Sequence, residues 1–494
     1  MNTVRDYELG APLPAVEDAV SVSLPRWGDV IDYEKGLPRV VSALRTGYPR
    51  FVIHPCVEKL FRHARGRNAR EGEEVFVFPC RAAAERAMHF LLRNGNCGGR
   101  IVELAGENSN AQPLAALFFP EHGRTWVKLY WQHAGEIISS RRARAFLSGC
   151  SDEAEHDGKA ARTKLRKRIA ELAGGIPSDV YLFASGMAAA AAVLRAVCAI
   201  CPGMPIVQFG FPYVDLLKLQ ERCGSGVAFF PRGDGADLQS LTSALKKVRH
   251  AGLFAEFPGN PLLRSVDIAA LSTLCRDYKL PFIIDDTLGS LWNSALLPYS
   301  DALMVSLTKY FSGGGDVMGG ALILNNQSTC YRQMKELLLA ENDDGLWCED
   351  AAALASNSRD FALRMEKVNT TAFALASFLR ESPRVQACFY PAWTDAALYL
   401  RIKRARGGFG GLVSFVLKGG EKGARAFFDS LPLAKGPGFG NSFTIVSPAV
   451  LLAHYQELPW AEACGVPRNL IRVSVGLEEE PELRAAFHAS LSKT

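Results

Sequence analysis

The chain has 494 residues, of which 48% are hydrophobic and 22% are charged. At about 150 residues per domain this length corresponds to about three domains, and the average composition excludes disordered, collagen-like and coiled-coil chains. The formal net charge of +5, from 56 Lys and Arg against 51 Asp and Glu, is small for this length. It argues against a dedicated nucleic-acid-binding protein.

The N-terminal residues Met1–Glu8 are polar and acidic, so they do not have the pattern of a secretory signal. No run of about 18 uncharged apolar residues offers a membrane-spanning helix. We therefore expect a cytoplasmic protein with no membrane partner. The twelve cysteines include one close pair, Cys198 and Cys201, which lacks further ligands at zinc spacing, so we expect no metal site.

Residues 1–135 have the pattern of an N-terminal α+β extension without a catalytic motif. Apolar alternation predicts strands and one helix there. The predicted strands are Glu74–Pro79, Arg100–Leu104, Leu117–Pro120 and Thr125–Trp131, and the predicted helix is Ala82–Arg93.

Residues 136–382 follow a strand-turn-helix rhythm, after an arm at Glu136–Leu147. Short apolar runs bounded by Gly, Pro or Asp occur at Val180–Phe183, Pro205–Phe209, Gly252–Phe257 and Pro281–Ile284, and a helical stretch runs from about Asp350 to Arg380. This rhythm predicts an α/β fold with a mostly parallel sheet and helices on both faces. Ligands bind beyond the carboxyl ends of such strands. Polar residues follow these runs and are therefore expected to converge on one site. They are Ser185, Asn260, Asp285 and Lys309.

Residues 383–494 are predicted to form a smaller C-terminal α/β domain. Its strand-like segments are Ala387–Tyr390, Gly410–Leu417 and Leu470–Val475. We place the domain boundary near Pro383.

One lysine and one aspartate are the main candidates for catalytic residues. Lys309 follows the apolar run Ala302–Val305 within Ser306-Leu307-Thr308-Lys309, and Asp285 ends the apolar strand Phe282–Ile284. A buried carboxylate needs a cationic partner. A pyridinium N–H is one such partner, and a lysine that forms a Schiff base with an aldehyde is the other half of pyridoxal 5′-phosphate (PLP) binding.

The phosphate of such a cofactor needs an anion site. Ser185-Gly186-Met187 begins a predicted helix, whose first backbone N–H groups are free and whose dipole is positive at that end. Glycine there lets the backbone approach an anion closely. One glycine turn is a weak signal. The glycine turn followed along the chain by Asp285 and then Lys309 is a much more specific signal for PLP binding.

These segments resemble the PLP-dependent enzymes of cysteine and methionine metabolism related to cystathionine γ-synthase. The matching motifs are Ser185-Gly186-Met187-Ala188, Phe209-Gly210, Glu256 to Pro261, Asp285-Asp286-Thr287, Ser306 to Lys309, Val317 to Gly320, and Ile471 to Glu478. The chain is most similar to the longer, fungal-type cystathionine γ-synthases, because Ala19 to Pro25 and Gly47-Tyr48-Pro49-Arg50-Phe51 resemble segments of their N-terminal extension. The resemblance implies the fold of type I PLP-dependent transferases.

The resemblance also implies roles for individual residues. Lys309 would hold the cofactor as a Schiff base and move protons, and Asp285 would keep the pyridine nitrogen protonated. The remaining roles are ring stacking by Phe209, a phenolic hydrogen bond from Asn260, phosphate binding by Gly186, Met187, Ser306 and Thr308, and substrate carboxylate binding by Arg472. Arg141 would reach the phosphate of a neighbouring subunit, so a homodimer or homotetramer with shared active sites is implied.

Two departures from the family pattern concern the substrate. Ser139 replaces a tyrosine two residues before Arg141, and Gly438 replaces a serine near the substrate. The missing side chain at Gly438 either makes room for a bulky substrate or only eases a Gly-Pro-Gly turn.

Four functions remain open from the sequence. The first is γ-replacement on an activated homoserine, with an O-acyl-L-homoserine and cysteine as the leading pair, through a vinylglycine-type quinonoid intermediate. The second keeps this chemistry but uses S-adenosylmethionine or O-acetylhomoserine with a carbon or nitrogen nucleophile. The third is a β- or γ-lyase. The fourth is a non-catalytic PLP-fold protein, against which the intact Lys309, Asp285 and Arg472 argue.

Overall fold

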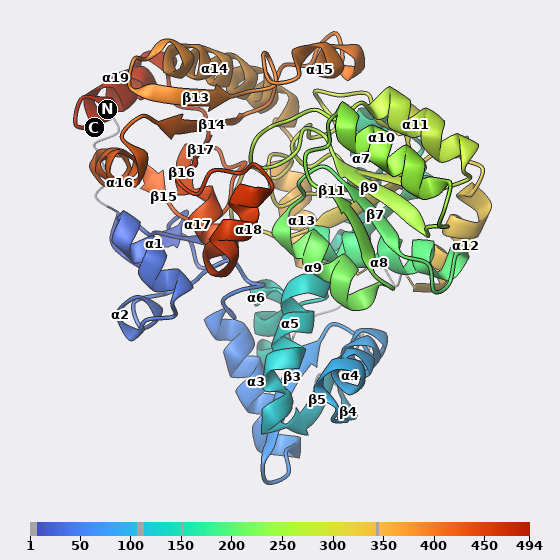
Figure 1. Cartoon of the computed structure of the whole chain (residues 1–494). Coiled ribbons are helices and arrows are strands. Elements are labelled where there is room, and N and C mark those ends of the chain that lie inside the picture. Colours follow the sequence, from blue (N-terminus) through green and yellow to red (C-terminus); the bar gives the residue numbers. More distant parts are fainter. Residues whose placement is uncertain (1–6, 106–112, 150–152, 342–344) are drawn as a thin grey trace.

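The computed structural model describes residues 7–105, 113–149, 153–341 and 345–494. These residues form a large sheet of seven strands and two smaller ones of five and three strands, together with one short strand pair. Figure 1 shows the large sheet and its helices beside the C-terminal sheet, with the N-terminal three-stranded sheet below both. The expected α/β fold with a smaller C-terminal sheet and an N-terminal α+β extension is confirmed.

The large sheet has the strand order β6-β12-β11-β10-β9-β7-β8. Strands β11, β10, β9, β7 and β8 are parallel, and β12 is antiparallel to both of its neighbours. The bounds are β6 (Val180–Phe183), β7 (Ile206–Phe209), β8 (Val227–Phe230), β9 (Gly252–Glu256), β10 (Phe282–Asp285), β11 (Ala302–Ser306) and β12 (Gly320–Leu324). The four apolar runs predicted for this part of the chain are therefore strands of one sheet.

Helices cover both faces of this sheet because each strand is apolar on both sides. In β10, Phe282 and Ile284 belong to one buried cluster, and Ile283 belongs to the other. This alternation follows from the two-residue repeat of a strand. The first cluster includes α7 (Glu153–Ala173), α10 (Gly235–Leu245) and α11 (Ile268–Asp277), and the second includes α8 (Gly186–Ile200), α9 (Val214–Cys223) and α12 (Tyr331–Glu341).

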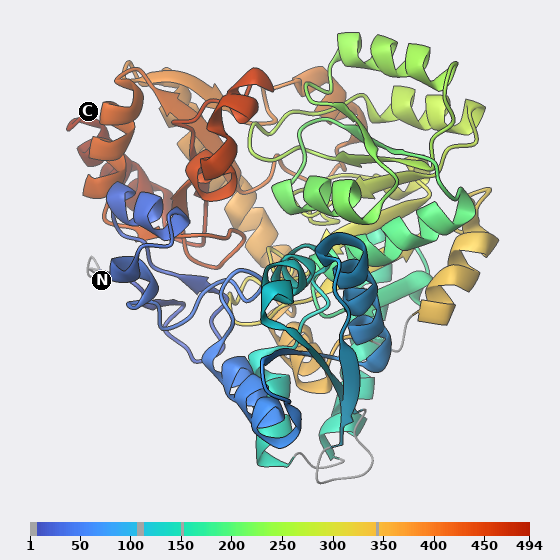
Figure 2. The same ribbon diagram turned by 60° about the horizontal axis from the view of Figure 1, so that its bottom comes forward.

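The N-terminal lobe contains an antiparallel sheet of order β3-β5-β4. Its strands are β3 (Glu73–Phe78), β4 (Arg100–Leu104) and β5 (Leu114–Pro120), and its helices are α3 (Pro55–Asn68), α4 (Arg81–Gly95) and α5 (Arg124–Ala134). Helix α5 contacts α8 and α9 of the large sheet's second face. Figure 2 brings this lobe forward.

The predicted strand Thr125–Trp131 is wrong, because this segment belongs to α5. Aromatic and β-branched residues suggested a strand. The buried residues Val127, Tyr130, Trp131 and Ala134 instead recur at the three- and four-residue spacing of a helix. The helix ends at Gly135, whose φ of 66° is left-handed.

The C-terminal sheet has the order β13-β14-β17-β16-β15. Its strands are β13 (Val385–Phe389), β14 (Leu412–Leu417), β15 (Ala434–Lys435), β16 (Ile445–Pro448) and β17 (Ile471–Ser474). Its helices are α15 (Ala396–Ile402), α16 (Gly420–Ser430), α17 (Ala449–His454), α18 (Leu458–Ala463) and α19 (Glu480–Leu491). The expected long helix before this sheet is two helices, α13 (Cys348–Asn357) and α14 (Phe361–Glu381), with a break at 358–360.

The first segment of the described chain lies against this C-terminal sheet. It contains β1 (Pro12–Leu13), β2 (Ser21–Val22), α1 (Trp27–Glu34) and α2 (Pro38–Val41). The backbone N–H of Trp27 donates to Asp429 over 2.6 Å, and the Trp27 ring packs edge-on against Phe428. Figures 1 and 2 both show α1 beside α16. The division at residues 135 and 382 remains a prediction.

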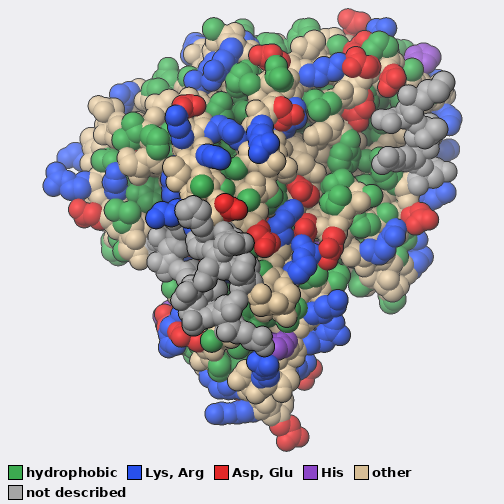
Figure 3. Space-filling view, turned by 180° about the vertical axis from the view of Figure 1, so that it is seen from behind, with side chains coloured by type: hydrophobic (Ala, Val, Ile, Leu, Met, Phe, Trp, Pro, Cys, Tyr) green, Lys and Arg blue, Asp and Glu red, His purple; other side chains and the backbone are tan. Residues whose placement is uncertain are grey.

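The surface of the described residues carries both positively and negatively charged side chains. On the face that Figure 3 shows, Lys and Arg are interspersed with Asp and Glu, in keeping with the small net charge. Within the described ranges, no helix is both long and apolar enough to cross a bilayer. These residues also contain no group of three potential metal ligands.

Candidate active site

A cavity of about 1010 Å³ opens at the carboxyl ends of β9, β10 and β11. Glu256, Asp285 and Ser306 are the last residues of these strands, and all three line it. They lie on the α8 side because each stands two residues after a strand residue of the second buried cluster. The sequence-predicted residues in the wall are Gly186, Met187, Asn260, Asp285, Ser306, Lys309, Gly438 and Arg472.

Lys309 reaches the cavity from the loop that follows β11. Its Nζ lies 4.5 Å from the ring centre of Tyr48 and 4.8 Å from that of Phe439. Burial lowers the pKa of Lys309, and the positive charges of Arg50 and Arg472 lower it further, whereas Tyr48 opposes them. The amine is therefore easier to deprotonate than an exposed lysine.

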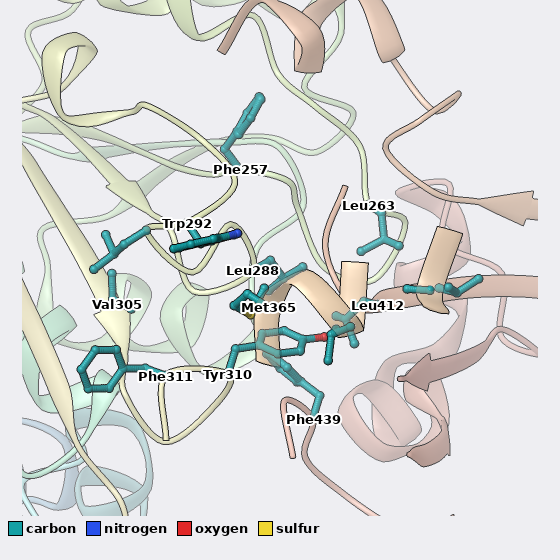
Figure 4. Close-up of a cluster of buried hydrophobic side chains, with 14 of the residues drawn as sticks. Phe257, Leu263, Leu288, Trp292, Val305, Tyr310, Phe311, Met365, Leu412 and Phe439 are labelled. Carbon is teal, nitrogen blue, oxygen red and sulfur yellow. The ribbon is translucent and has the colours of Figure 1, made fainter. Parts of the chain in front are cut away.

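The loop after Lys309 is fixed by core packing and by one buried arginine. Figure 4 shows Tyr310 and Phe311 among the hydrophobic side chains between the large sheet and the C-terminal part. Arg364 of α14 donates to the backbone carbonyls of Tyr310, Phe311 and Ser312 over 2.9 to 3.1 Å. These contacts hold the backbone that presents the amine.

Asp285 lies beside a second carboxylate in the cavity. Its parallel neighbour in the sheet is Glu256, and its Oδ1 accepts a hydrogen bond of 2.8 Å from the backbone N–H of Thr287. Burial raises the pKa of Asp285 to about 6, and burial together with the charge of Asp285 raises the pKa of Glu256 to about 8. Among the described residues neither carboxylate forms a salt bridge, so this part of the cavity suits a cationic N–H group.

The start of α8 faces the same cavity and suits a phosphate. Ser185 caps the helix by accepting from the N–H of Ala188 over 3.0 Å, and Gly186 and Met187 follow it. A Cβ on Gly186 would lie 2.8 Å from the Cβ of Ser306, so only glycine fits here. The residues thus fit a group with a phosphate, a protonated ring nitrogen and an aldehyde that meets a lysine.

Arg472 of β17 lies opposite, in the wall made by the C-terminal sheet. Its guanidinium donates to Asn260 Oδ1 over 2.9 Å and to the carbonyl of Gly438 over 3.2 Å. Burial lowers its pKa to about 10. Within the described residues it forms no salt bridge, so a buried positive charge is available to a carboxylate of a ligand.

Three sequence-predicted residues do not line the cavity. Phe209 belongs to the first buried cluster, on the sheet face opposite Asp285, while Phe211 and Tyr213 from the loop after β7 line the wall. The hydroxyl of Thr308 exchanges hydrogen bonds with the backbone of Gly319. These placements separate Phe209 and Thr308 from the predicted cofactor site.

Arg141 is the third residue outside the wall. It lies in α6 (Ser140–Ser148), and its guanidinium is within 3.2 Å of Asp316, 3.5 Å of Asp18 and 3.6 Å of Asp350. Ser139 caps this helix by accepting from the N–H of Arg142. Arg141 thus does not reach the cavity of its own chain, and its service to a neighbouring subunit remains a prediction.

Gly438 lines the cavity with a left-handed φ of 102°. A Cβ there would meet only Ser21, at 3.8 Å or more. The backbone conformation alone therefore favours glycine at this turn. The structure supplies a reason for Gly438 that does not depend on the size of a substrate.

Several residues of the site carried no predicted role. Tyr48 and Arg50 come from the N-terminal extension, and Tyr213 comes from the loop after β7. Arg50 is buried, and its guanidinium binds Asp215 over 2.5 Å and the hydroxyl of Tyr213 over 2.6 Å. The only sequence signal was that Gly47 to Phe51 belongs to a segment resembling other N-terminal extensions.

Comparisons with known proteins agree with this geometry. The family model described as Cys/Met metabolism PLP-dependent enzyme matches residues 156–492, and the model described as fungal trans-sulfuration enzyme, N-terminal domain, matches residues 56–139. The chain is 34% identical to a cystathionine gamma-synthase of Neurospora crassa over 98% of each chain. It is 31% identical to the cystathionine gamma-synthase-like enzyme iboG1 of Amanita muscaria, over 99% of this chain and 98% of that one.

A solved structure is also similar. The cystathionine gamma synthase from Xanthomonas oryzae pv. oryzae, crystallised with aminoacrylate and cysteine, matches with a TM-score of 0.61 and 25% identity. The match covers 69% of this chain and 87% of that one.

Proposed function

This chain belongs to the PLP-dependent enzymes of cysteine and methionine metabolism, and from that premise we propose that it catalyses γ-replacement on an activated homoserine. An O-acyl-L-homoserine and cysteine are the leading substrate pair. The observation that carries the proposal is the meeting of Lys309, Asp285 and Arg472 in one cavity. None of the three forms a salt bridge within the described chain. The resemblance to cystathionine γ-synthases and the type I fold are confirmed.

The residues that would hold PLP follow from their placement. Asp285 would pair with the ring nitrogen, Gly186 and Met187 with Ser306 would bind the phosphate, and Lys309 would bind the aldehyde carbon. When bound, PLP supplies an electron sink for the charge that develops at Cα. Tyr213, rather than Phe209, offers an aromatic ring at the wall.

The chain's own residues would then handle the substrate. Arg472 would bind the α-carboxylate and hold the substrate in one orientation. The neutral Lys309 amine would take the Cα proton and then a Cβ proton, and it would return protons to both carbons after the replacement at Cγ. The Cγ–O bond would break, so that the acyloxy group leaves as a carboxylate with the bonding electrons, and the deprotonated sulfur of cysteine would form the new bond to Cγ.

A second candidate keeps the γ-chemistry with another nucleophile or with S-adenosylmethionine as donor. The breadth of the cavity supports it, because about 1010 Å³ is at the upper end of ligand pockets. Its wall extends past the catalytic groups to Tyr33 and Glu34 in α1 and to Tyr455 after α17. A lyase reaction would need the same first steps without a second amino-acid substrate.

A crossed substrate screen tests the function. Purified protein with PLP would be incubated with O-acylhomoserines or S-adenosylmethionine, each alone and with cysteine or carbon and nitrogen nucleophiles, and the products identified by mass spectrometry. Cystathionine from an acylhomoserine and cysteine is expected. A keto acid from the donor alone would favour the lyase, and the absence of any donor consumption would contradict γ-chemistry.

Borohydride reduction tests the cofactor lysine separately. We expect the yellow holoenzyme to be bleached and the pyridoxyl group to be found on Lys309 by peptide mapping. Lys309→Ala should show no covalent adduct. A reduced adduct on another lysine would contradict the assignment.

A further inference from the structure

A loop of the N-terminal extension places a tyrosine against the amine of Lys309. Tyr48 is only 8% exposed, and its ring centre is 4.5 Å from Lys309 Nζ. The loop is a tight turn, because the N–H groups of Phe51 and Val52 both bind the carbonyl of Tyr48. A Cβ at Gly47 would lie 2.6 Å from Val52, so the turn depends on glycine.

A fixed positive charge also lies beside this tyrosine. The guanidinium carbon of Arg50 is 5.3 Å from the Tyr48 ring centre. Asp215 holds Arg50 over 2.5 Å and is itself bound by Gln132 and His133, each over 3.1 Å. Arg50 therefore cannot move away without breaking a buried ion pair.

The proton affinities of Tyr48 and Lys309 are both altered. Burial alone would raise the pKa of Tyr48, but the positive charges of Lys309 and Arg50 lower it overall. The pKa of Lys309 is lowered as well, by burial, Arg50 and Arg472. Each group can thus lose its proton closer to neutral pH than it would in water.

The other tyrosine beside this loop is not equivalent. The hydroxyl of Tyr213 accepts from Arg50 and donates to Asp215 over 3.0 Å. Burial and Asp215 raise its pKa well above the ordinary value. Tyr213 therefore keeps its proton, which it donates to Asp215, whereas the ring of Tyr48 lies 4.5 Å from the reactive amine and the hydroxyl of Tyr48 donates to no carboxylate among the described residues.

We propose that Tyr48 is a catalytic residue whose phenol exchanges a proton with the Lys309 amine, an inference that rests on the proposed function. In one direction the tyrosinate takes a proton from the Lys309 ammonium, so an O–H bond forms as an N–H bond breaks. The neutral amine can then accept the Cα proton of the substrate. In the other direction the phenol returns the proton to Lys309, and neither step changes an oxidation state.

The test compares Tyr48→Phe with wild type and with Tyr331→Phe. Tyr331 is a matched control, because its hydroxyl lies 2.7 Å from Lys335 Nζ but outside the cavity. The first measurement is exchange of the Cα proton of an amino-acid substrate in D2O, followed by NMR. We expect Tyr48→Phe to slow it by at least about tenfold, since proton transfer by a positioned group contributes that much or more. Tyr331→Phe should exchange at the wild-type rate.

The second measurement is the pH midpoint of the visible absorbance of the holoenzyme, which reports protonation at Lys309 Nζ. Tyr48 raises the proton affinity of this nitrogen while Arg50 and Arg472 lower it. The midpoint should therefore move to lower pH in Tyr48→Phe. An unchanged midpoint, or exchange at the wild-type rate, would overturn the proposal.

The outcomes separate this inference from the proposed function. If wild type itself exchanged no Cα proton, the proposed function would fail, and the absorbance midpoint alone would decide on Tyr48. If Tyr48→Phe unfolded, 3,5-difluorotyrosine at position 48 would keep the shape and acidify the phenol. The exchange profile should then shift to lower pH, and a fixed profile would overturn the proposal.

Discussion

Three buried ionisable side chains in the cavity have no oppositely charged partner among the described residues. The carboxyl groups of Asp285 and Glu256 end neighbouring strands, and the guanidinium of Arg472 lies across the cavity. A buried charge costs free energy unless something neutralises it. Folding alone does not account for this arrangement. A bound ligand that carries both a positive and a negative charge would account for it.

The pH dependence of stability should reveal the carboxylates. The pKa of Asp285 rises from 3.8 to about 6 on folding, and that of Glu256 rises to about 8. A raised pKa means that the folded state holds the proton more tightly, so this stability is complete below about pH 4 and is lost as the pH rises.

For Asp285 the loss is roughly 3 kcal/mol. We expect urea unfolding of the cofactor-free protein to show decreasing stability from pH 5 to 8.5, and Asp285→Asn to flatten the lower part of this decline. PLP should restore the wild-type stability at high pH but not that of Asp285→Asn. Stability that does not change over this range would argue against a carboxylic acid that is neutral when folded.

Arg472 should matter for substrate binding. Arg472→Lys keeps the charge but loses the two-pronged contact to a carboxylate, so kcat/KM should fall by about 100-fold. Arg468→Lys is the control, because Arg468 pairs with Glu462 on the surface of the same domain. Steady-state kinetics with PLP saturating would check both, and an equal effect of the two variants would contradict the role.

At the scale of elements, the two-residue repeat of the strands decides which side chains meet. Asp285 and Ser306 face α8, and Phe209 of β7 faces the opposite cluster. The loop after β7 brings Tyr213 to the wall instead. Successive residues at the end of a strand face opposite sides of the sheet. A site role assigned to one of them is therefore wrong if the assignment is off by one residue.

The close contact of α8 with β11 gives a sharp test of the phosphate site. Gly186→Ala would place a Cβ 2.8 Å from Ser306 and should weaken PLP retention severely. Gly66→Ala in α3 has no atom within 4 Å of the new Cβ, and it should stabilise that helix by ~0.5–1 kcal/mol. Equilibrium dialysis of PLP and thermal melting would separate the two, and normal PLP retention by Gly186→Ala would contradict the assignment.

At the scale of the whole molecule, the site draws on all three parts of the chain. Tyr48 and Arg50 come from the N-terminal extension, Asp285 and Lys309 from the large sheet, and Arg472 from the C-terminal sheet. Arg141, a predicted cofactor contact, is held outside the cavity of its own chain by acidic side chains.

Subunit complementation tests whether Arg141 serves a neighbour. Arg141→Ala and Lys309→Ala should each be inactive alone, and mixtures reassembled after dissociation should regain up to about a quarter of the wild-type activity in shared sites. Size-exclusion chromatography would first establish a dimer or tetramer. Subunit exchange without recovered activity would show that Arg141 acts within its own chain or not in catalysis.

The fold class and the family could be read from the sequence, and so could several residues that line the candidate site. Lys309, Asp285 and Gly186 could be predicted because each lies at the end of a strand or the start of a helix, where local sequence patterns are strong. The error at Thr125–Trp131 was also local, since aromatic residues suit strands and buried helices alike.

The contacts between distant segments became visible with the tertiary structure. Tyr48 lies 261 positions before Lys309 in the chain, and no spacing rule relates them. Their meeting depends on how the N-terminal segment packs between the large sheet and the C-terminal sheet, and on Asp215 holding Arg50. Such contacts are set by the summed packing of many apolar residues, which a local pattern does not encode.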